Sequence, residues 1–548
     1  MELTYQDRSV TIPDGTPASE CLEALDLQPR KALAVIHSQR LYELNDALFG
    51  DGDIRPLTLQ DAEGRRIYER SARFILLMAV DALYPGMRLR FEFSVSSGVF
   101  VRAVDRPLTS RDIRCIERKM REIVEQDLPL ESQLWKTGDA IAYFQQRGWE
   151  DKIQLLRYRT FPMIRMYGCG NLWEYFYGAM VPSTGYIGCF DLLLHDRSMI
   201  LQLPNAKSPD QPAPYIERPR LMETFAQSAR WCSVLGVNNV SDLSDLMEKR
   251  QLRHFIRLNE ALHDQALVNC AQRIVQNHRR IVLVSGPSSS GKTTFAARLA
   301  IQLQVLGAKA YRVSLDNYYL DRDAIPREED GSQDLEHIRT LDLPLLQDQV
   351  RHLLKGEEVS IPEFSFLTGK REKDGTPLCL GDNDIVILEG IHALNPLLSS
   401  GIPPQAIYRV FVSDLTCLNL DDHNRIRTTD MRLLRRIVRD HLFRNTSPRD
   451  TLAMWPSVRR GEETWVFPYQ EQADTFFNTT LHYELPVLRH YAYELLREPD
   501  PSWEGYLLAL RLRKTLNYIP DIDEDLLNEI PPLSLLREFI GGGTIELR

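Results

Sequence analysis

A short segment rich in glycine and serine carries the strongest chemical signal in this chain of 548 residues. Residues 281–300 read IVLVSGPSSSGKTTFAARLA, an apolar strand followed by the pattern Gly286-x4-Gly291-Lys292-Thr293 and a helix-forming stretch. The glycines permit a tight turn, so backbone N–H groups and the helix N-terminus can surround a phosphate. Lys292 can reach the β- and γ-phosphates, and the Thr293 hydroxyl can hold Mg²⁺. The segment predicts a nucleoside triphosphate site, with these nucleotide-binding residues: Gly286, Ser288, Ser289, Ser290, Gly291, Lys292, Thr293 and Thr294.

Two carboxylates follow at the ends of predicted strands. Asp316 comes after the strand 312–315, and Glu389 comes after the apolar strand 384–388. The carboxyl ends of parallel strands lie at the same edge of a sheet, beside the phosphate loop. There Asp316 can accept a proton from an attacking hydroxyl, and Glu389 can face the Mg²⁺ shell. The alternatives are structural, since Asp316 could cap the following turn and Glu389 could simply end its strand.

Arginine is concentrated in residues 421–460, which contain ten Arg, no Lys, five Asp and no Glu. Four of the arginines lie at i, i+3, i+4 and i+7 and therefore share one helix face: Arg432, Arg435, Arg436 and Arg439. Guanidinium groups bind phosphate oxygens in bidentate fashion. We interpret the stripe as a lid that closes over the triphosphate and excludes water. The alternative is a solvated face paired with aspartates of the same helix.

Hydrophobic patterning divides the chain into four parts. Residues 1–62 contain short alternating runs around one helical stretch, a unit of β-grasp size, and residues 63–205 mix helices with strands. A polar, Pro-rich break follows, and residues 206–280 read as a helical connector. From 281 to 548 strands alternate with helices, which predicts a parallel sheet with helices on both faces. The expected fold is an α/β C-terminal half joined to an α+β N-terminal half.

Composition narrows the classes of function. Apolar residues make up 43% and charged residues 26% of the chain, as in ordinary globular proteins. The net charge of −10 argues against generic binding to nucleic acid or anionic membranes. The eight cysteines are scattered without a C-x-x-C pair, as is typical of reduced cysteines in the cytoplasm. No signal-peptide core follows Met1, and the most apolar run, 74–84, is too short to span a bilayer. We therefore expect a cytoplasmic protein without a membrane partner.

Residues 281–480 resemble the uridine/cytidine kinase and phosphoribulokinase group of P-loop kinases. The matching stretches are GPSSSGKTT, SLDNYYL, QDLEHIRTLDLPLL, VSIPEF with the later KR, IVILEGIHAL and RLLRRIVRDHLFRN. The resemblance implies ATP and Mg²⁺ as cofactors, with Glu389 and Thr293 supporting the metal. It assigns catalysis to four residues: Asp316 as the base, Lys292, Arg435 and Arg439. It also assigns Arg444 to the nucleotide, Glu336 to the ribose hydroxyls, Phe364 to the base of a nucleoside, and Arg371 to the same substrate site.

The sequence departs from uridine kinases at this substrate site. Glu336 stands where they carry an aspartate, Phe364 where they carry a tyrosine, and Gly369 where they carry a histidine. A site that loses hydrogen-bond donors to a base loses discrimination for that base. The identity of the nucleoside therefore stays open.

Residues 1–205 resemble the N-terminal appendage of threonyl-tRNA synthetases, a TGS domain followed by the second additional domain that edits mischarged tRNA. The resemblance rests on YERSARFILLMAVDALYP, DIRCIERKMREIVEQDLPL and GNLWEYFYGAMVPSTGYIGCFDLL. The four metal-ligand positions of the editing site correspond to Arg70, Phe74, Phe176 and Met180, which do not bind zinc. We therefore expect an editing-like domain without its metal site, which serves as a ligand-binding, oligomerising, regulatory or merely packing unit.

The leading hypothesis is an ATP- and Mg²⁺-dependent kinase of the 5′-hydroxyl of a ribonucleoside, most like uridine. The first alternative is a phosphoribulokinase-like kinase of another small hydroxyl acceptor. The second is an ATP-gated regulator that binds RNA through the N-terminal half, which the acidic net charge disfavours. No N/T-K-x-D motif occurs, which argues against a GTP switch. The expected partners are a small-molecule nucleoside, ATP and a second copy of the chain in a homo-oligomer.

Overall fold

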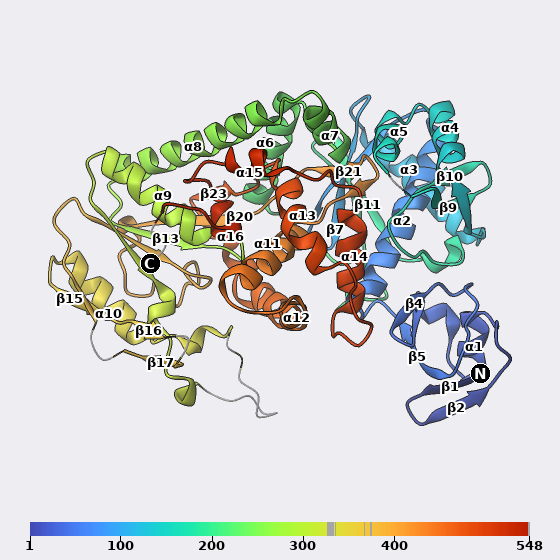
Figure 1. The fold of residues 1–548 in the computed structure, drawn as a ribbon, viewed down its shortest axis with the longest axis horizontal. Coiled ribbons are helices and arrows are strands. Elements are labelled where there is room, and N and C mark those ends of the chain that lie inside the picture. The colour runs from blue at the N-terminus through green and yellow to red at the C-terminus, as the bar shows by residue number, and fades with distance from the viewer. Residues whose placement is uncertain (160, 326–333, 335, 366–367, 373–374, 546–548) are drawn as a thin grey trace.

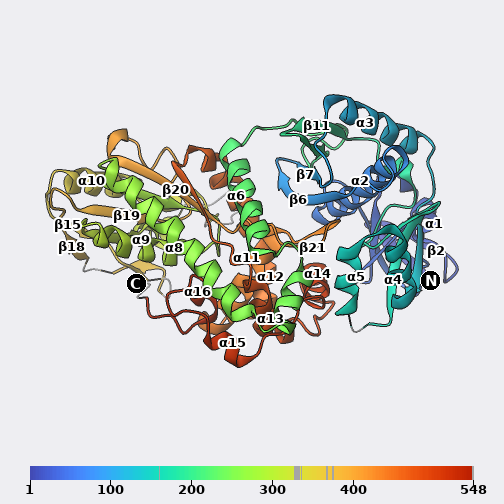
Figure 2. The same ribbon diagram turned by 90° about the horizontal axis from the view of Figure 1, so that it is seen from above.

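The computed structural model describes residues 1–159, 161–325, 334, 336–365, 368–372 and 375–545. In both views the first strands of the chain lie at one end of the molecule and β15 (Val359–Ile361) lies at the other (Figures 1 and 2). Within the described ranges, no helix combines the length and the apolar character that a membrane crossing requires.

The N-terminal unit is a five-stranded sheet with one helix. Its strand order is β2-β1-β5-β3-β4, and β1 pairs with β5 in parallel. The elements are β1 (Glu2–Tyr5), β2 (Arg8–Thr11), α1 (Ala18–Ala24), β3 (Ala34–His37), β4 (Arg40–Tyr42) and β5 (Gly52–Leu57). Leu3, Cys21, Leu22 and Ile54 are buried between the helix and the sheet. The predicted β-grasp unit is confirmed.

The second unit packs helices against two antiparallel sheets. One sheet has the order β11-β12-β7-β6 and the other β10-β9-β8. The elements are α2 (Ala62–Leu83), β6 (Leu89–Val95), β7 (Gly98–Ala103), α3 (Ser110–Glu125), β8 (Glu131–Lys136), α4 (Thr137–Arg147), α5 (Glu150–Arg157), β9 (Met163–Cys169), β10 (Leu172–Glu174), β11 (Asp191–His195) and β12 (Ser198–Gln202). The α+β character predicted for this half is confirmed.

The four positions that correspond to editing ligands are filled by packing. The Phe74 and Phe176 rings meet edge to face at 5.8 Å, and Met180 is 2% exposed. Arg70 is buried and donates to the carbonyl of Ala179. These side chains form part of a hydrophobic core and leave no set of metal donors at the four positions.

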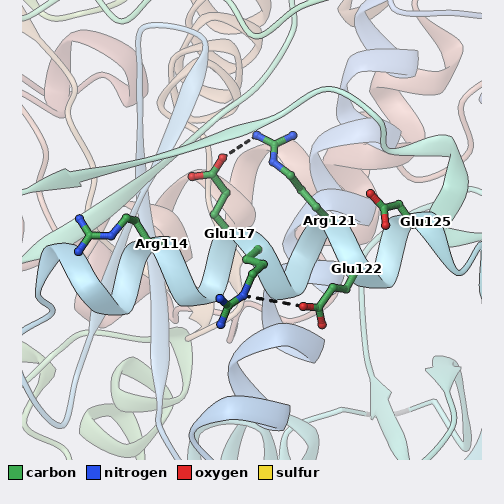
Figure 3. Close-up of a pocket in the computed structure, with 6 residues that line it drawn as sticks. Arg114, Glu117, Arg121, Glu122 and Glu125 are labelled. Carbon is green, nitrogen blue, oxygen red and sulfur yellow. Dashed lines mark hydrogen bonds and ion pairs between the residues drawn. The ribbon is translucent and has the colours of Figure 1, made fainter.

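The outer face of α3 is charged but balanced (Figure 3). Six residues form a shallow surface there: Arg114, Glu117, Arg118, Arg121, Glu122 and Glu125. Arg121 pairs with Glu117 at 2.6 Å, and Arg118 pairs with Glu122 at 3.8 Å. Equal numbers of acidic and basic side chains give this face no net positive charge.

The C-terminal half is built on a five-stranded parallel sheet of order β14-β19-β13-β20-β23. The strands are β13 (Ile281–Ser285), β14 (Ala310–Ser314), β19 (Ile385–Glu389), β20 (Ile407–Ser413) and β23 (Thr475–Asn478). Alternate residues of β13 face opposite cores, because Val282 and Val284 pack with α8 (Leu252–Gln276) and α9 (Lys292–Val305), whereas Ile281 and Leu283 pack with α10 (Leu343–Leu354). The predicted parallel sheet with helices on both faces is confirmed, and α8 lies along α9 in both views (Figures 1 and 2).

Residues 206–545 contain further elements. They are α6 (Pro219–Leu235), α7 (Val240–Glu248), β16 (Phe364–Ser365), β17 (Lys370–Arg371), β18 (Thr376–Leu378), β21 (Asn419–Asp421), β22 (Asn424–Arg425), α11 (Thr428–Phe443), α12 (Pro448–Trp465), α13 (Glu484–Leu495), α14 (Tyr506–Leu516), α15 (Glu524–Asn528) and α16 (Arg537–Ile540). The three domain boundaries predicted from the sequence stay predictions. Residues 252–276 nonetheless share a core with the sheet, since α8 contributes Phe255, Ile256 and Ile274 to it.

Candidate active site

The phosphate loop connects β13 to α9 through a turn that only glycine permits at two positions. A Cβ on Gly286 would lie 1.9 Å from the carbonyl oxygen of Val412. Gly291 has φ +87° and is the N-cap residue of α9. The hydroxyls of Ser289 and Ser290 are buried and have no hydrogen-bond partner among the described residues. The loop therefore places free donors and a helix N-terminus together, as anion binding requires.

Lys292 lies at the centre of four carboxylates. Its side chain is half-buried, and its ammonium donates to the carbonyl of Pro287 at 3.0 Å. Burial lowers the pKa of Lys292, and the charges of four acidic residues oppose that shift: Glu389, Glu538, Asp316 and Glu462. The phosphate loop and the acidic residues thus share one small volume.

Thr293 and Glu389 meet as the sequence predicts. The Thr293 hydroxyl donates to Glu389 at 3.2 Å across the gap between α9 and the end of β19. Burial, and then the charge of Asp316, raise the pKa of Glu389 to about 7. No group of three or more His, Cys, Asp or Glu in the described part of the chain could hold a metal ion. Mg²⁺ in phosphoryl-transfer sites uses one or two protein oxygens together with substrate phosphates, so this pair fits such an ion.

Asp316 lies one residue beyond β14, in a short 3₁₀ turn over residues 315–318. Asp316 is exposed to solvent. Desolvation by the surrounding protein raises the pKa of its carboxyl, with Lys292 and then Arg444 opposing that shift. A carboxylate whose basicity is raised in this way is suited to accept a proton. Asp316 and Lys292 lie near enough for their charges to interact.

Helices α11, which carries the arginine stripe, and α12 both bind the backbone of Ser288 in the phosphate loop. Glu462 accepts from the Ser288 N–H at 2.9 Å, and Arg432 donates to the Ser288 carbonyl at 2.9 Å. Arg432 and Glu462 also form a bidentate pair with each other, and both are 2% exposed. Arg436 adds a hydrogen bond of 2.8 Å to the Ser288 hydroxyl. The arginine stripe therefore reaches the loop through Arg432 and Arg436.

The structure corrects the prediction that Arg435 is a lid arginine. Arg435 is 0% exposed, pairs with Glu484 at 2.6 Å and donates to the Thr479 carbonyl. Its position on the helix turns it into the core, so it cannot reach a phosphate. Arg439 lies on the outer side and donates to Asp440 at 2.7 Å. Arg444 is 58% exposed and lies near enough to Asp316 for their charges to interact.

On the acceptor side, Glu336 faces the lid. Burial raises its pKa to about 7, and Arg436 opposes that shift. A Cβ on Gly461 of α12 would lie 2.6 Å from the Cβ of Glu336, so α12 packs directly against this carboxylate. Phe364 lies across from Tyr319, with ring centroids 5.7 Å apart. Glu336 and Phe364 therefore border the region of Asp316, since Tyr319 interacts with the charges of both Asp316 and Glu336.

Arg371, which was predicted to bind substrate, lies against the segment that follows Asp316. Its guanidinium donates to the carbonyls of Tyr318 and Tyr319 at 3.0 Å and to Asp342 at 3.0 Å. These bonds use three of its five N–H donors and hold the segment that follows Asp316. Arg371 is a positioning residue for that segment. At Gly369, a Cβ would lie 2.7 Å from the Arg322 side chain.

Two residues at the site were missed from the sequence. Glu462 lies in α12, and Glu538 lies in the last helix, α16. Glu538 accepts from the Thr294 N–H at 3.2 Å and from the Thr294 hydroxyl at 2.7 Å. Both are separated from the loop by more than a hundred residues of chain, and no local pattern marks such contacts.

Comparisons with known proteins divide the chain in the same way. Residues 281–484 match the model of the Phosphoribulokinase / Uridine kinase family. The match confirms the resemblance drawn from the motifs of this region, which has the character of a P-loop kinase.

The N-terminal region matches threonine–tRNA ligases. That of Granulibacter bethesdensis is 31% identical over 191 residues, which are 33% of this chain and 30% of the ligase. That of Maricaulis maris is 32% identical over 193 residues, 33% of this chain and 30% of the ligase. The chain thus spans less than a third of the length of these relatives.

Among solved structures, a putative fructose transport system kinase from Silicibacter sp. TM1040 covers 38% of this chain and 98% of its own at 20% identity and a TM-score of 0.29. A possible uridine kinase from Bacillus stearothermophilus covers 36% and 89%, at 19% identity and a TM-score of 0.25. At these TM-scores the two likenesses carry no further argument.

Proposed function

We propose that this protein is a kinase that transfers the γ-phosphoryl group of ATP to the 5′-hydroxyl of a ribonucleoside. One observation carries the proposal: the Asp316 carboxylate lies near enough to the phosphate-loop lysine Lys292 and to Glu389, the partner of Thr293, for their charges to interact. This set combines a proton acceptor, a cation for the phosphates and oxygen donors for Mg²⁺. A nucleotide-binding module without chemistry would not need the proton acceptor.

The proposed reaction is an in-line displacement. The acceptor oxygen forms a bond to the γ-phosphorus while the bond from that phosphorus to the β-bridging oxygen breaks, which releases ADP. Asp316 takes the proton of the attacking hydroxyl, and Lys292 stabilises negative charge on the transferred group. Arg436, held at Ser288, lies next to the same loop and adds positive charge. Bound Mg²⁺, held by Thr293 and Glu389, would neutralise charge on the β- and γ-phosphates.

The proposed acceptor combines a ribose, which carries a vicinal diol, with a planar base. Glu336 can accept from two neighbouring hydroxyls, and Phe364 with Tyr319 supplies aromatic rings for a base. A second candidate is a phosphorylated or simple sugar, which the longer Glu336 and the absent tyrosine hydroxyl at Phe364 favour. The balanced charge of the α3 face argues against RNA as the ligand of that surface (Figure 3).

The test measures ADP release by the full chain with ATP and Mg²⁺ against a panel of ribonucleosides, deoxyribonucleosides and sugar phosphates. Turnover with a ribonucleoside supports the proposal. Turnover only with a sugar phosphate transfers it to the second candidate, and no turnover with either class refutes it.

A matched pair of variants assigns the base. Asp316→Asn should abolish turnover and leave ATP binding within about twofold, because the carboxylate acts on the acceptor proton. The control, Asp323→Asn, changes an exposed carboxylate of the same segment and should retain full activity. Equal rates in both variants would remove Asp316 from the mechanism.

A further inference from the structure

A cavity of about 230 Å³ lies where the two halves of the molecule meet, far from the phosphate loop in sequence. Residues of α2, the α4–α5 segment and β10 form its N-terminal walls, and Asp422 and His423 close it from the C-terminal half. The last two residues belong to the hairpin β21–β22, whose strand β21 lies next to α5 and α7 in the structure (Figures 1 and 2). None of the residues proposed for phosphoryl transfer lines this cavity.

His423 presents a fixed imidazole to the cavity. The side chain is 5% exposed, and its Nδ1 contacts the fully buried Glu174, which also pairs with Lys152 at 2.8 Å. In the neutral ring, a carboxylate on Nδ1 holds the proton there and leaves a lone pair on Nε2. No hydrogen bond to Nε2 exists among the described residues. The cavity therefore contains an oriented hydrogen-bond acceptor, Nε2 of His423, that suits an N–H donor of a ligand.

Asp151 is the second polar group at the cavity. Its Oδ2 accepts from the Asp422 N–H at 2.8 Å, but no ion pair to Asp151 exists within the described part of the chain. The other two carboxylates at the cavity have arginine partners, since Asp81 pairs with Arg147 at 2.9 Å and Asp422 with Arg90 at 3.5 Å. Burial, with Asp422 and Asp421 adding to it and with Lys152 and His423 opposing it, raises the pKa of Asp151 to about 6. A ligand cation would compensate this carboxylate.

The other walls are apolar. Leu77, Val80, Met87, Leu89 and Leu172 line the cavity beside the ring of Trp149. Such a chamber suits a small apolar body with one cationic donor at its polar end. A primary ammonium satisfies both the Asp151 carboxylate and Nε2 of His423. Arg147, at the same cavity, could additionally pair with a ligand carboxylate, so α-amino acids and simple amines share the chemistry.

The hairpin that closes the cavity leads directly into the lid helix. Asp421 contacts Lys152, and Arg425 and Arg427 both pair with Glu69 of α2, at 3.1 and 2.8 Å. Helix α11 begins at Thr428 and carries Arg432, which binds the phosphate loop. A ligand that shifts Asp422 and His423 thus acts on the segment that places the lid.

We propose that this cavity binds a small primary amine with an apolar body, such as an α-amino acid, and that its occupancy changes the affinity of the phosphate loop for ATP. The N-terminal half then acts as a sensor for the C-terminal half. Because affinities of the two ligands are linked, ATP must change amine binding by the same factor.

The binding test uses isothermal titration calorimetry and thermal shift on the full chain. The probes are the twenty proteinogenic amino acids, isopentylamine, and 4-methylpentanoate, which lacks the amine. At least one amine-bearing probe should bind with a Kd of about 1 mM or lower, and 4-methylpentanoate should not. Amino acids binding more tightly than isopentylamine would assign Arg147 to the carboxylate. The absence of binding by every amine probe, or equal binding by the acid, would overturn the proposal.

Variants make the test specific to this cavity. Asp151→Asn should weaken binding at least tenfold, while Glu150→Gln, an exposed neighbour on the same helix, should not change it. Because Asp151→Asn could perturb folding, Asp151→Glu serves as a second variant and should retain binding. Equal affinity of Asp151→Asn and Glu150→Gln would place the ligand elsewhere and refute the site.

The coupling test measures ATP affinity with and without the bound amine. A change of threefold or more, lost in Asp151→Asn, supports the link to the lid, and no change would refute it. Neither test requires catalytic turnover, so a negative result in either is distinct from a failure of the proposed kinase activity.

Discussion

Glu538 accepts a hydrogen bond from the Thr294 N–H, a donor that a nucleotide phosphate is expected to use. Its carboxylate accepts from the N–H and the hydroxyl of Thr294, in the first turn of α9, at 3.2 and 2.7 Å. Leu535 packs against Gly291, so the chain around α16 lies over the loop (Figure 1). The N–H groups of this first turn are the ones that surround phosphates in such loops. We therefore predict that Glu538 competes with ATP.

The perturbation is Glu538→Gln, which keeps the size of the side chain and removes its charge. Hydrogen bonds to a charged group contribute about 1.5–3 kcal/mol. ATP must break these hydrogen bonds in order to bind. If the substitution removes only the lower end of this range, about 1.5 kcal/mol, ATP binds about tenfold more tightly, since about 1.4 kcal/mol corresponds to tenfold. Removing a negative charge beside the triphosphate acts in the same direction.

The assay is calorimetric titration of the full chain with a non-hydrolysable ATP analogue. The matched control is Glu529→Gln, which removes ion pairs with Arg253 and Arg257 from the same C-terminal segment and leaves the loop untouched. The control should bind the analogue as the unchanged protein does. If Glu538→Gln binds the analogue as weakly as the control, or more weakly, Glu538 does not compete with the nucleotide and the reasoning fails.

Three further predictions test the placement of other residues. Arg435→Met should lower the free energy of unfolding by about 3–5 kcal/mol, because it leaves Glu484 buried without its cation. The ATP affinity of the folded protein should stay unchanged. A loss of ATP affinity at full stability, measured by calorimetry and denaturant titration, would return Arg435 to the set of lid arginines. Gly461→Ala should raise the KM for the acceptor about tenfold or more, and the KM for ATP much less, because its Cβ would lie 2.6 Å from Glu336; steady-state kinetics with unchanged acceptor KM would contradict this contact. His482 has its pKa lowered by burial from 6.5 to about 4, so the unfolded chain binds its proton first and stability is lost as pH falls below 6.5. At pH 5.5 the loss relative to pH 7.5 is about 1.3 kcal/mol, and His482→Gln should remove that part of the pH dependence in denaturant titrations.

Local patterns predicted much of the fold and of the nucleotide site. The strand 281–285, the loop and the helix after it follow from apolar runs and glycine positions within one stretch of chain. Asp316 and Glu389 follow because parallel strands end at the same edge of their sheet. Each inference rests on residues close in sequence or on a rule about strand ends.

Helical spacing predicted the arginine stripe but could not show which of its arginines contact the phosphate loop. Arg432 and Arg436 reach Ser288, whereas Arg435, one residue from Arg436, is buried against Glu484. A helix face is broad, and which part of it meets the loop depends on how α11 packs on α12 and α13. The same limit applies to Arg371, whose partners are backbone carbonyls that no sequence pattern reveals.

The sequence by itself determined a triphosphate loop, its carboxylates, a parallel sheet and an N-terminal half without editing ligands. These depend on short-range spacing and on residue type, which the chain displays directly. Only the tertiary structure decided that Glu462 and Glu538 contact the loop and that His423 and Asp151 face one cavity. Those contacts join segments distant along the chain, and packing of whole helices and hairpins, which no local pattern encodes, sets them.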